Sequence, residues 1–152
     1  MAAHELVNPL NENDWRAYHD IRRQVLFEAR GQFGVYSENH PDDQAPGHYA
    51  KLLKYDGEPV GVVRIDIHGV VAILRRVAIR AEVQKRGHGR ALLSLAQQVA
   101  EEAGCTRLES FVAPDAINFY RNAGFEISGS QSADPPHGQS VLMSKDLSTR
   151  PG

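Results

Sequence analysis

The eight residues Gln84–Ala91 read Gln-Lys-Arg-Gly-His-Gly-Arg-Ala, and they stand between a strand-like and a helix-like segment. Gly87 and Gly89 remove side chains at positions where backbone N–H groups can close around phosphate oxygens. The helix that follows adds unpaired N–H groups and the positive end of its dipole. This stretch predicts a turn that binds pyrophosphate without a metal, while an ordinary glycine-containing turn stays open as the alternative.

Two well-known phosphate-binding loops do not fit this stretch. A Walker loop needs Gly-Lys followed by Ser or Thr, but here the second glycine is followed by Arg90 and Ala91. A dinucleotide-binding loop needs a third glycine where Leu92 stands, and it should follow the first strand of a parallel sheet. Lys85, Arg86 and Arg90 could add charge for a further phosphate group.

The neighbouring segments carry the periodicities of strands and helices. Extended, Val- and Ile-rich runs predict strands around Glu5–Val7 and over Tyr49–Tyr55, Glu58–Ile67, Val70–Ile79, Thr106–Val112, Phe125–Ser128 and Ser140–Lys145. Apolar residues three and four positions apart predict helices over Asp14–Arg30, Arg90–Ala103 and Asp115–Ala123. A helix between two strands usually joins parallel partners by a right-handed crossover, whereas Asp56-Gly57 signals an antiparallel hairpin. We therefore expect an α/β (α+β) fold with a central mixed sheet flanked by helices.

The segment Gln32–Gly47 has no clear period, and we expect a loop there with at most one helical turn. It gathers Glu38, Asp42 and Asp43 without a basic neighbour. These carboxylates would either be solvated at the surface or attract a cationic amine.

Length and composition predict one compact domain over residues 1–152. The chain has 152 residues, of which 41% are apolar and 24% charged, as in ordinary globular proteins. No run approaches the roughly 18 apolar residues of a membrane-spanning helix, so we expect no membrane partner and a cytoplasmic location. The single cysteine, Cys105, cannot form an internal disulfide. Ser148–Gly152 is expected to be a loose tail.

Charge is distributed unevenly along the chain. The net charge is −2, yet the segment Arg75–Arg90 carries six basic residues and one acidic residue. A basic spot in an acidic protein suits a small polyanion better than a nucleic acid, although a solvated charged turn is an equally good explanation from charge alone. The seven histidines show no metal-ligand spacing, and we expect no metal.

The signature around the glycines resembles that of the GNAT superfamily of acyl-CoA-dependent N-acetyltransferases. That signature is Arg or Gln, two residues, Gly, one residue, then Gly or Ala, and Gln84, Gly87 and Gly89 match it. A second signature of the family is similar to Asn118–Tyr120 followed by Gly124-Phe125. Two signatures in the right order are far more specific than either alone.

The resemblance covers roughly residues 58–147, and Trp15–Phe27 resembles the first helix of the family. It implies a mostly antiparallel, splayed sheet. The strand equivalent to Leu74–Ile79 would carry a bulge and separate from the strand equivalent to Thr106–Val112, admitting the pantetheine arm of acetyl-CoA. The residues that the resemblance implies for coenzyme A binding are Val77, Ala78, Ile79, Gln84, Lys85, Arg86, Gly87, His88, Gly89, Arg90, Asn118 and Tyr120.

The same resemblance implies the chemistry of acetyl transfer. Tyr120 matches the family tyrosine that can protonate the departing thiolate, with a packing tyrosine as the alternative. Asn118 would either bond the cofactor arm or simply cap a helix. Family members often place a glutamate on the splayed strand, but here Arg75 and Arg76 stand where it would be sought. The general base is therefore unassigned, with Glu109, Glu38, Asp42 and His40 as weak candidates.

We expect an enzyme that moves an acetyl group from acetyl-CoA to a primary amine by direct attack through a tetrahedral intermediate. The amine could belong to a small molecule or a peptide, and the family resemblance is compatible with a homodimer. The absent strand carboxylate leaves a second interpretation, a non-catalytic acyl-CoA-binding sensor. A nucleic-acid-binding domain that uses Arg75–Arg90 is a third, which salt-dependent DNA retention would reveal.

Overall fold

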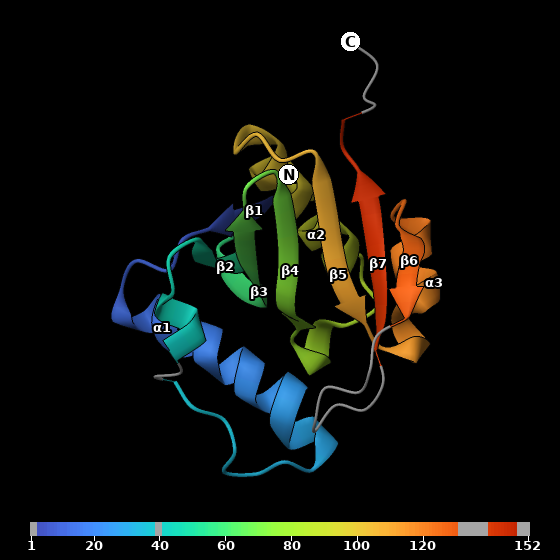
Figure 1. The fold of residues 1–152 in the computed structure, drawn as a ribbon. Helices are drawn as coiled ribbons and strands as arrows, with labels where there is room; N and C mark the ends of the chain where they lie inside the picture. Colours follow the sequence, from blue (N-terminus) through green and yellow to red (C-terminus); the bar gives the residue numbers. More distant parts are fainter. Residues whose placement is uncertain (1–2, 39–40, 131–139, 149–152) are drawn as a thin grey trace.

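The computed structural model describes residues 3–38, 41–130 and 140–148, and within them the strands form one sheet in the order β1-β2-β3-β4-β5-β7-β6 (Figure 1). The strands are β1 (His4–Val7), β2 (His48–Tyr55), β3 (Glu58–His68), β4 (Val71–Ile79), β5 (Arg107–Val112), β6 (Glu126–Ser130) and β7 (Val141–Asp146). Every neighbouring pair is antiparallel except β4 and β5, which are parallel. The mixed, mostly antiparallel sheet is confirmed. Most of the loose tail predicted at the C-terminus lies outside the described residues.

The helices also lie where the apolar periods predicted them. Their bounds are α1 (Glu12–Ile21), α2 (His88–Glu102) and α3 (Ile117–Asn122), with short helical segments η1 (Arg22–Phe27), η2 (Glu28–Arg30), η3 (Pro41–Gln44), η4 (Ala81–Val83) and η5 (Pro114–Ala116). Helix α1 begins before the predicted Asp14 because the side chain of Asn11 accepts a hydrogen bond from the Asp14 N–H at 2.8 Å. No helix in the described part of the chain is long and apolar enough to span a bilayer.

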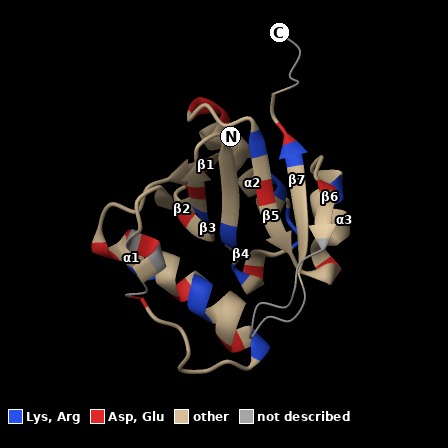
Figure 2. Cartoon of the chain, viewed as in Figure 1, with Lys and Arg blue, Asp and Glu red and all other residues tan. Residues whose placement is uncertain are grey.

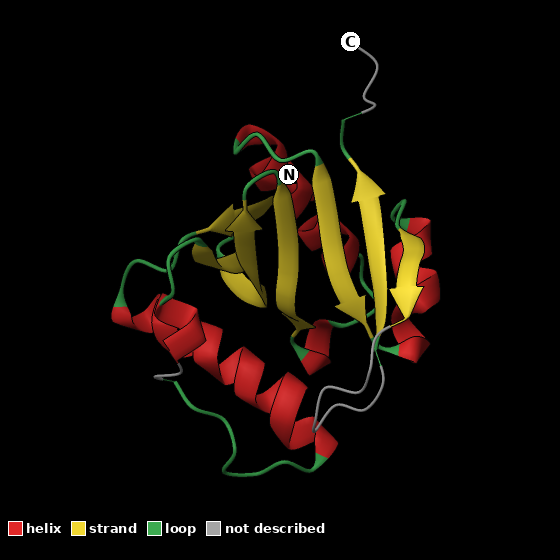
Figure 3. Cartoon of the chain, viewed as in Figure 1, coloured by secondary structure: helices red, strands yellow, loops and turns green. Residues whose placement is uncertain are grey.

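The helices cover both faces of the sheet (Figures 1 and 3). Helix α2 buries Leu92 and Ala96 against Ile65 and Leu74 of the sheet, and α3 joins this core through Tyr120. On the other face, α1 contributes Tyr18 and Ile21 to a separate core cluster that includes Leu52, Val62 and Ala78 of the sheet. The two faces of the sheet therefore carry separate core clusters, one packed against α2 and α3 and the other against α1.

The sheet opens between β4 and β5. Their parallel pairing runs from Val71 opposite Arg107 to Leu74 opposite Ser110 and includes no residue further along either strand. On its other side, β4 carries a bulge, because Arg76 and Val77 together face the single residue Val63 of β3. Both the bulge and the separation confirm what the family resemblance implied.

Candidate functional site

A cleft of about 1310 Å³ occupies the region where β4 and β5 separate. Its walls come from β3, β4 and β5, from the end of the α1–η2 helical segment, from the loop before α2, and from α3. The cleft therefore brings residues of the α1-face cluster, such as Leu26 and Ala78, into one cavity with Leu74 and Tyr120 of the α2-face core.

The glycine turn forms one end of this cleft. Gly87 has a φ of +89° and precedes the first residue of α2, and no side chain caps the helix there. The first N–H groups of α2 are consequently available to an anion. At Gly89, an added Cβ would lie only 2.9 Å from Cζ of Phe119. Glycine at this position lets α3 pack against the start of α2.

Gln84 connects the turn to the splayed strand. Its Nε2 donates a hydrogen bond to the carbonyl oxygen of Ile79 at 3.0 Å. The first residue of the signature therefore fixes the loop against the end of β4. The Ile79 carbonyl, which the resemblance assigned to the pantetheine arm, is therefore already hydrogen-bonded. The main chain of Val77 is the better-placed candidate to bind the arm.

Tyr120 lies in the wall of the cleft and is only 7% exposed. Its ring contacts Phe119 and Phe125 edge-on. Burial raises the pKa of the phenol, and a hydrogen bond with Ser110 acts in the opposite direction. The phenol is thus held protonated at neutral pH, as a proton donor must be.

The structure separates the residues implied for coenzyme A binding into two groups. Those that line the cleft are Val77, Ala78, Ile79, Gln84, Lys85, Gly87, Gly89, Arg90 and Tyr120. Arg86 and Asn118 are exposed and lie outside the lining. His88 is also outside the lining: its side chain is buried, with Nδ1 2.8 Å from Nε2 of His4.

Two of the four candidates for a general base, Glu109 and Glu38, lie outside the cleft. Glu109 is ion-paired with Arg107 at 2.6 Å, and Glu38 is ion-paired with Arg23 at 2.9 Å. Neither acidic residue lines the cleft. His40 lies outside the described residues, and so does the side chain of Asp42.

The acidic loop is partly buried. For Asp43, both predictions, a solvated carboxylate and a carboxylate that attracts a cationic amine, are wrong. The side chain of Asp43 is 5% exposed, and its oxygens accept hydrogen bonds from Arg22 and Arg64 at 2.9 Å each. Burial acts to raise its pKa, but the hydrogen bonds and charges of the two arginines outweigh burial and lower it. Asp43 is neither solvated nor free to attract an amine.

A buried group of charges beside the cleft was not predicted from the sequence. Arg64 donates to both carboxylate oxygens of Asp66, at 2.8 and 2.9 Å, and His48 lies 3.5 Å from the same carboxylate. His48 and Asp66 are register partners on β2 and β3. Counting back from the Asp56-Gly57 turn misses this partnership, because a bulge near Pro59 shifts the register by one residue.

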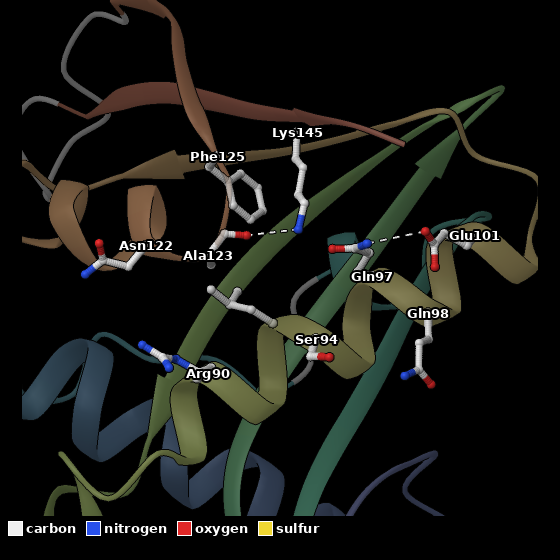
Figure 4. A pocket seen from close by; sticks show the side chains of 10 residues that line it. Arg90, Ser94, Gln97, Gln98, Glu101, Asn122, Ala123, Phe125 and Lys145 are labelled. Carbon is white, nitrogen blue, oxygen red and sulfur yellow. Dashed lines mark hydrogen bonds between the residues drawn. The ribbon is translucent and has the colours of Figure 1, made fainter. Parts of the chain in front are cut away.

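A smaller groove of about 460 Å³ lies between α2 and α3 (Figure 4). It shares Arg90 with the cleft and is lined further by Ser94, Gln97 and other polar side chains. Lys145 is held at its edge by a 2.9 Å hydrogen bond to the carbonyl oxygen of Ala123. In the described residues, no group of three or more His, Cys, Asp or Glu side chains is placed to hold a metal ion.

Comparison with known proteins agrees with this geometry. A family model described as the acetyltransferase (GNAT) family matches residues 8–125. A curated relative, the uncharacterized protein YyaT of Bacillus subtilis, is 31% identical over 99 residues, which are 64% of this chain. The match spans 65% of that relative, slightly less than two thirds of its length.

Solved structures of acetyltransferases have the same fold. An aminoglycoside 6'-N-acetyltransferase complexed with coenzyme A superposes with a TM-score of 0.80, at 14% identity, covering 99% of each chain. The ribosomal-protein-S18-alanine N-acetyltransferase of Escherichia coli superposes with a TM-score of 0.76, at 19% identity, covering 98% of this chain and 97% of the other. At these identities the likeness shows the fold alone.

Proposed function

Because this chain belongs to the acetyltransferase (GNAT) family, we propose that it transfers an acetyl group from acetyl-CoA to a primary amine by direct attack of the amine on the thioester. The observation that carries the proposal is the cleft at the β4–β5 separation. It joins an uncapped helix N-terminus, two glycines and a buried tyrosine in one continuous space.

The residues of the glycine turn fit a pyrophosphate. Gly87 and Gly89 leave the first N–H groups of α2 uncovered, and Lys85 and Arg90 line the cleft beside them. The bulged strand offers the main chain around Val77 to the pantetheine arm, as an added strand would be bound. Bound acetyl-CoA supplies the activated acetyl group.

Tyr120 supplies the proton for the leaving sulfur. In the reaction a bond forms between the amine nitrogen and the acetyl carbon, and the carbon–sulfur bond breaks. The phenol donates its proton to the leaving sulfur and takes up a proton from water as it does so. Because burial raises the pKa of Tyr120, a free tyrosinate would be costly. We therefore place the proton transfer together with the breaking of the carbon–sulfur bond.

Water in the open cleft accepts the proton that the attacking amine loses. The carboxylate of Asp66 lines the cleft, but Arg64 already holds both of its oxygens. Asp66 therefore serves the site as a fixed negative charge and not as the base.

Calorimetric titration with coenzyme A tests the assignment of the glycine turn. Gly87→Glu should abolish binding, because the new carboxylate occupies and repels the phosphate position. Gly34→Glu is the matched control: Gly34 also has a positive φ and open space around it, and it lies outside the cleft. Unchanged affinity in folded Gly87→Glu, or no binding by the unmodified protein, would refute the proposal. Thiol release with a panel of amines then tests transfer itself.

A further inference from the structure

We propose that the amine acceptor carries an anionic group, such as a carboxylate, and that Arg75 and Arg76 bind this group at the α1 side of the cleft. The inference rests on the proposed acetyl transfer and names the class of its acceptor. Both arginines line the cleft, where Arg76 contacts Phe27 of η1 and Arg75 contacts Phe111 of β5.

Two consecutive arginines at the bulge in β4 line one cavity. Successive residues of a regular strand point to opposite faces of the sheet. At this bulge, Arg76 has a φ of +57°, and Arg76 and Val77 share one partner on β3. The bulge redirects the chain so that Arg76 contacts Phe27, while Arg75, the residue before it, lies opposite Arg64 of β3. A left-handed conformation at a residue other than glycine is costly, and here it serves to place a charge.

Arg76 has no anionic partner within the described part of the chain. Its guanidinium lies 5.6 Å from the ring centre of Phe27, and no hydrogen bond or ion pair joins it to a described residue. Burial, followed by the charges of Arg22 and Arg64, lowers its pKa. A half-buried cation of this kind is stabilised when an anion enters the cleft.

Arg75 is only partly satisfied. Its Nε is buried without a hydrogen bond, and the nearest carboxylate oxygen, on Asp66, is 3.6 Å away. Its guanidinium lies 4.9 Å from the ring centre of Phe111, and the side chain is 38% exposed. The planar guanidinium is therefore positioned by its surroundings and still accessible from the cleft.

The nearby carboxylates are too few to neutralise these arginines. Asp66 is hydrogen-bonded to Arg64 and lies 3.6 Å from Arg75, and Asp43 is shared by Arg22 and Arg64. The group of Arg22, Arg64, Arg75 and Arg76 with Asp43 and Asp66 has a net charge of plus two. Figure 2 shows Lys and Arg at the lower end of β4 and along the helix that faces it. This charge attracts an anion and disfavours polycationic amines such as spermidine.

Matched acceptors test the inference. Straight-chain amino acids with the amine at one end and the carboxylate at the other are compared with alkylamines of the same length, with aminoalkyl phosphonates, and with spermidine. We expect kcat/KM to be higher for the anionic acceptors than for the alkylamines, and lowest for spermidine. The phosphonates decide whether the site prefers the planar carboxylate or a tetrahedral anion.

Substitutions assign the preference to the two arginines. Arg75→Gln and Arg76→Gln should each reduce the preference for anionic acceptors about tenfold or more, as expected for loss of a charge-assisted contact. The KM for acetyl-CoA should stay unchanged. Arg76→Lys retains the charge and should recover part of the preference. Arg107→Gln, on β5 outside the cleft, is the control and should leave it intact.

The possible failures are distinguishable. If the folded protein acetylates alkylamines or spermidine better than anionic amines, the acceptor class is wrong and the proposed function stands. The acceptor class is also wrong if the preference survives both Arg75→Gln and Arg76→Gln. If coenzyme A binds but none of the amines in the panel is acetylated, the proposed function fails, and the inference fails with it.

Discussion

Single side chains at the cleft combine a structural and a chemical task. Tyr120 fills a buried position between Phe119 and Phe125, and it also lines the cleft, with its hydroxyl in a hydrogen bond with Ser110. Gln84 fixes the loop to β4, although its place in a signature alone would suggest a ligand contact. A residue of this kind must be tested with a readout that separates packing from chemistry.

Tyr120→Phe removes the hydroxyl and keeps the ring. We expect kcat to fall about 10²-fold, the usual contribution of a general acid, with little change in the affinity for coenzyme A. The rate of thiol release gives kcat, and calorimetry gives the affinity for coenzyme A. Tyr49→Phe, at an exposed tyrosine on β2 outside the cleft, serves as the control. An unchanged kcat in Tyr120→Phe would remove this residue from the mechanism.

At the scale of elements, buried ion pairs join the acidic loop to the rest of the fold. Asp43 of η3 connects Arg22 of η1 with Arg64 of β3, and these two elements are far apart in sequence. The three side chains are less than a tenth exposed. The α1 side of the cleft, which contains Arg64, therefore depends on this loop for its shape.

Asp43→Asn leaves two buried guanidinium groups without their shared negative charge. We expect the free energy of unfolding to fall by roughly 3 kcal/mol, as when one partner of a buried ion pair is removed. Glu38→Gln is the matched control, because Glu38 belongs to the same loop and pairs with Arg23 at the surface. Its effect should stay below about 1 kcal/mol. Equal effects of the two substitutions in urea denaturation would contradict the interior role of Asp43.

For the whole molecule, the basic segment recognised in the sequence is divided between two positions in the cleft. Arg75 and Arg76 lie with the α1-face groups, Lys85 and Arg90 lie at the glycine turn, and Arg80 is paired with Glu82 at 2.7 Å. A single stretch of positive charge thus serves two positions, one on each side of the sheet opening. This division fits two small anionic groups and not the continuous backbone of a nucleic acid.

The stability of the whole molecule should decrease on acidification. Burial, with the charges of His4 and Arg86, lowers the pKa of His88 below its ordinary 6.5, and burial likewise lowers the pKa of His19. At about pH 6 these histidines bind protons more readily in the unfolded chain than in the folded chain. Their contribution to the free energy of unfolding is therefore at its maximum above about pH 6.5 and decreases below it. The lowered pKa of Asp43 adds a second loss below about pH 4.

Melting temperatures measured across this pH range check the expectation. The first loss of stability should become shallower in His88→Gln, whatever that substitution does to the melting temperature at neutral pH. A melting temperature that does not change, or that rises, between neutral pH and pH 5 would contradict the buried, neutral state of His88.

The sequence by itself determined the main strands and helices and the family, because these depend on local patterns. Apolar periods and turn residues such as Asp56-Gly57 act within a few positions, and the glycine turn needs only a strand before it and a helix after it. The prediction of a single domain stays a prediction, as do the individual ligand roles of residues such as Asn118.

Only the tertiary structure decided which side chains meet. Two bulges, near Pro59 on β3 and at Arg76 on β4, shift strand registers by one residue, and each shift changes the side-chain partners beyond it. Asp43 is buried because two arginines from separate elements converge on it. Such contacts join residues far apart in sequence, and their energies depend on burial and distance, which no local pattern encodes.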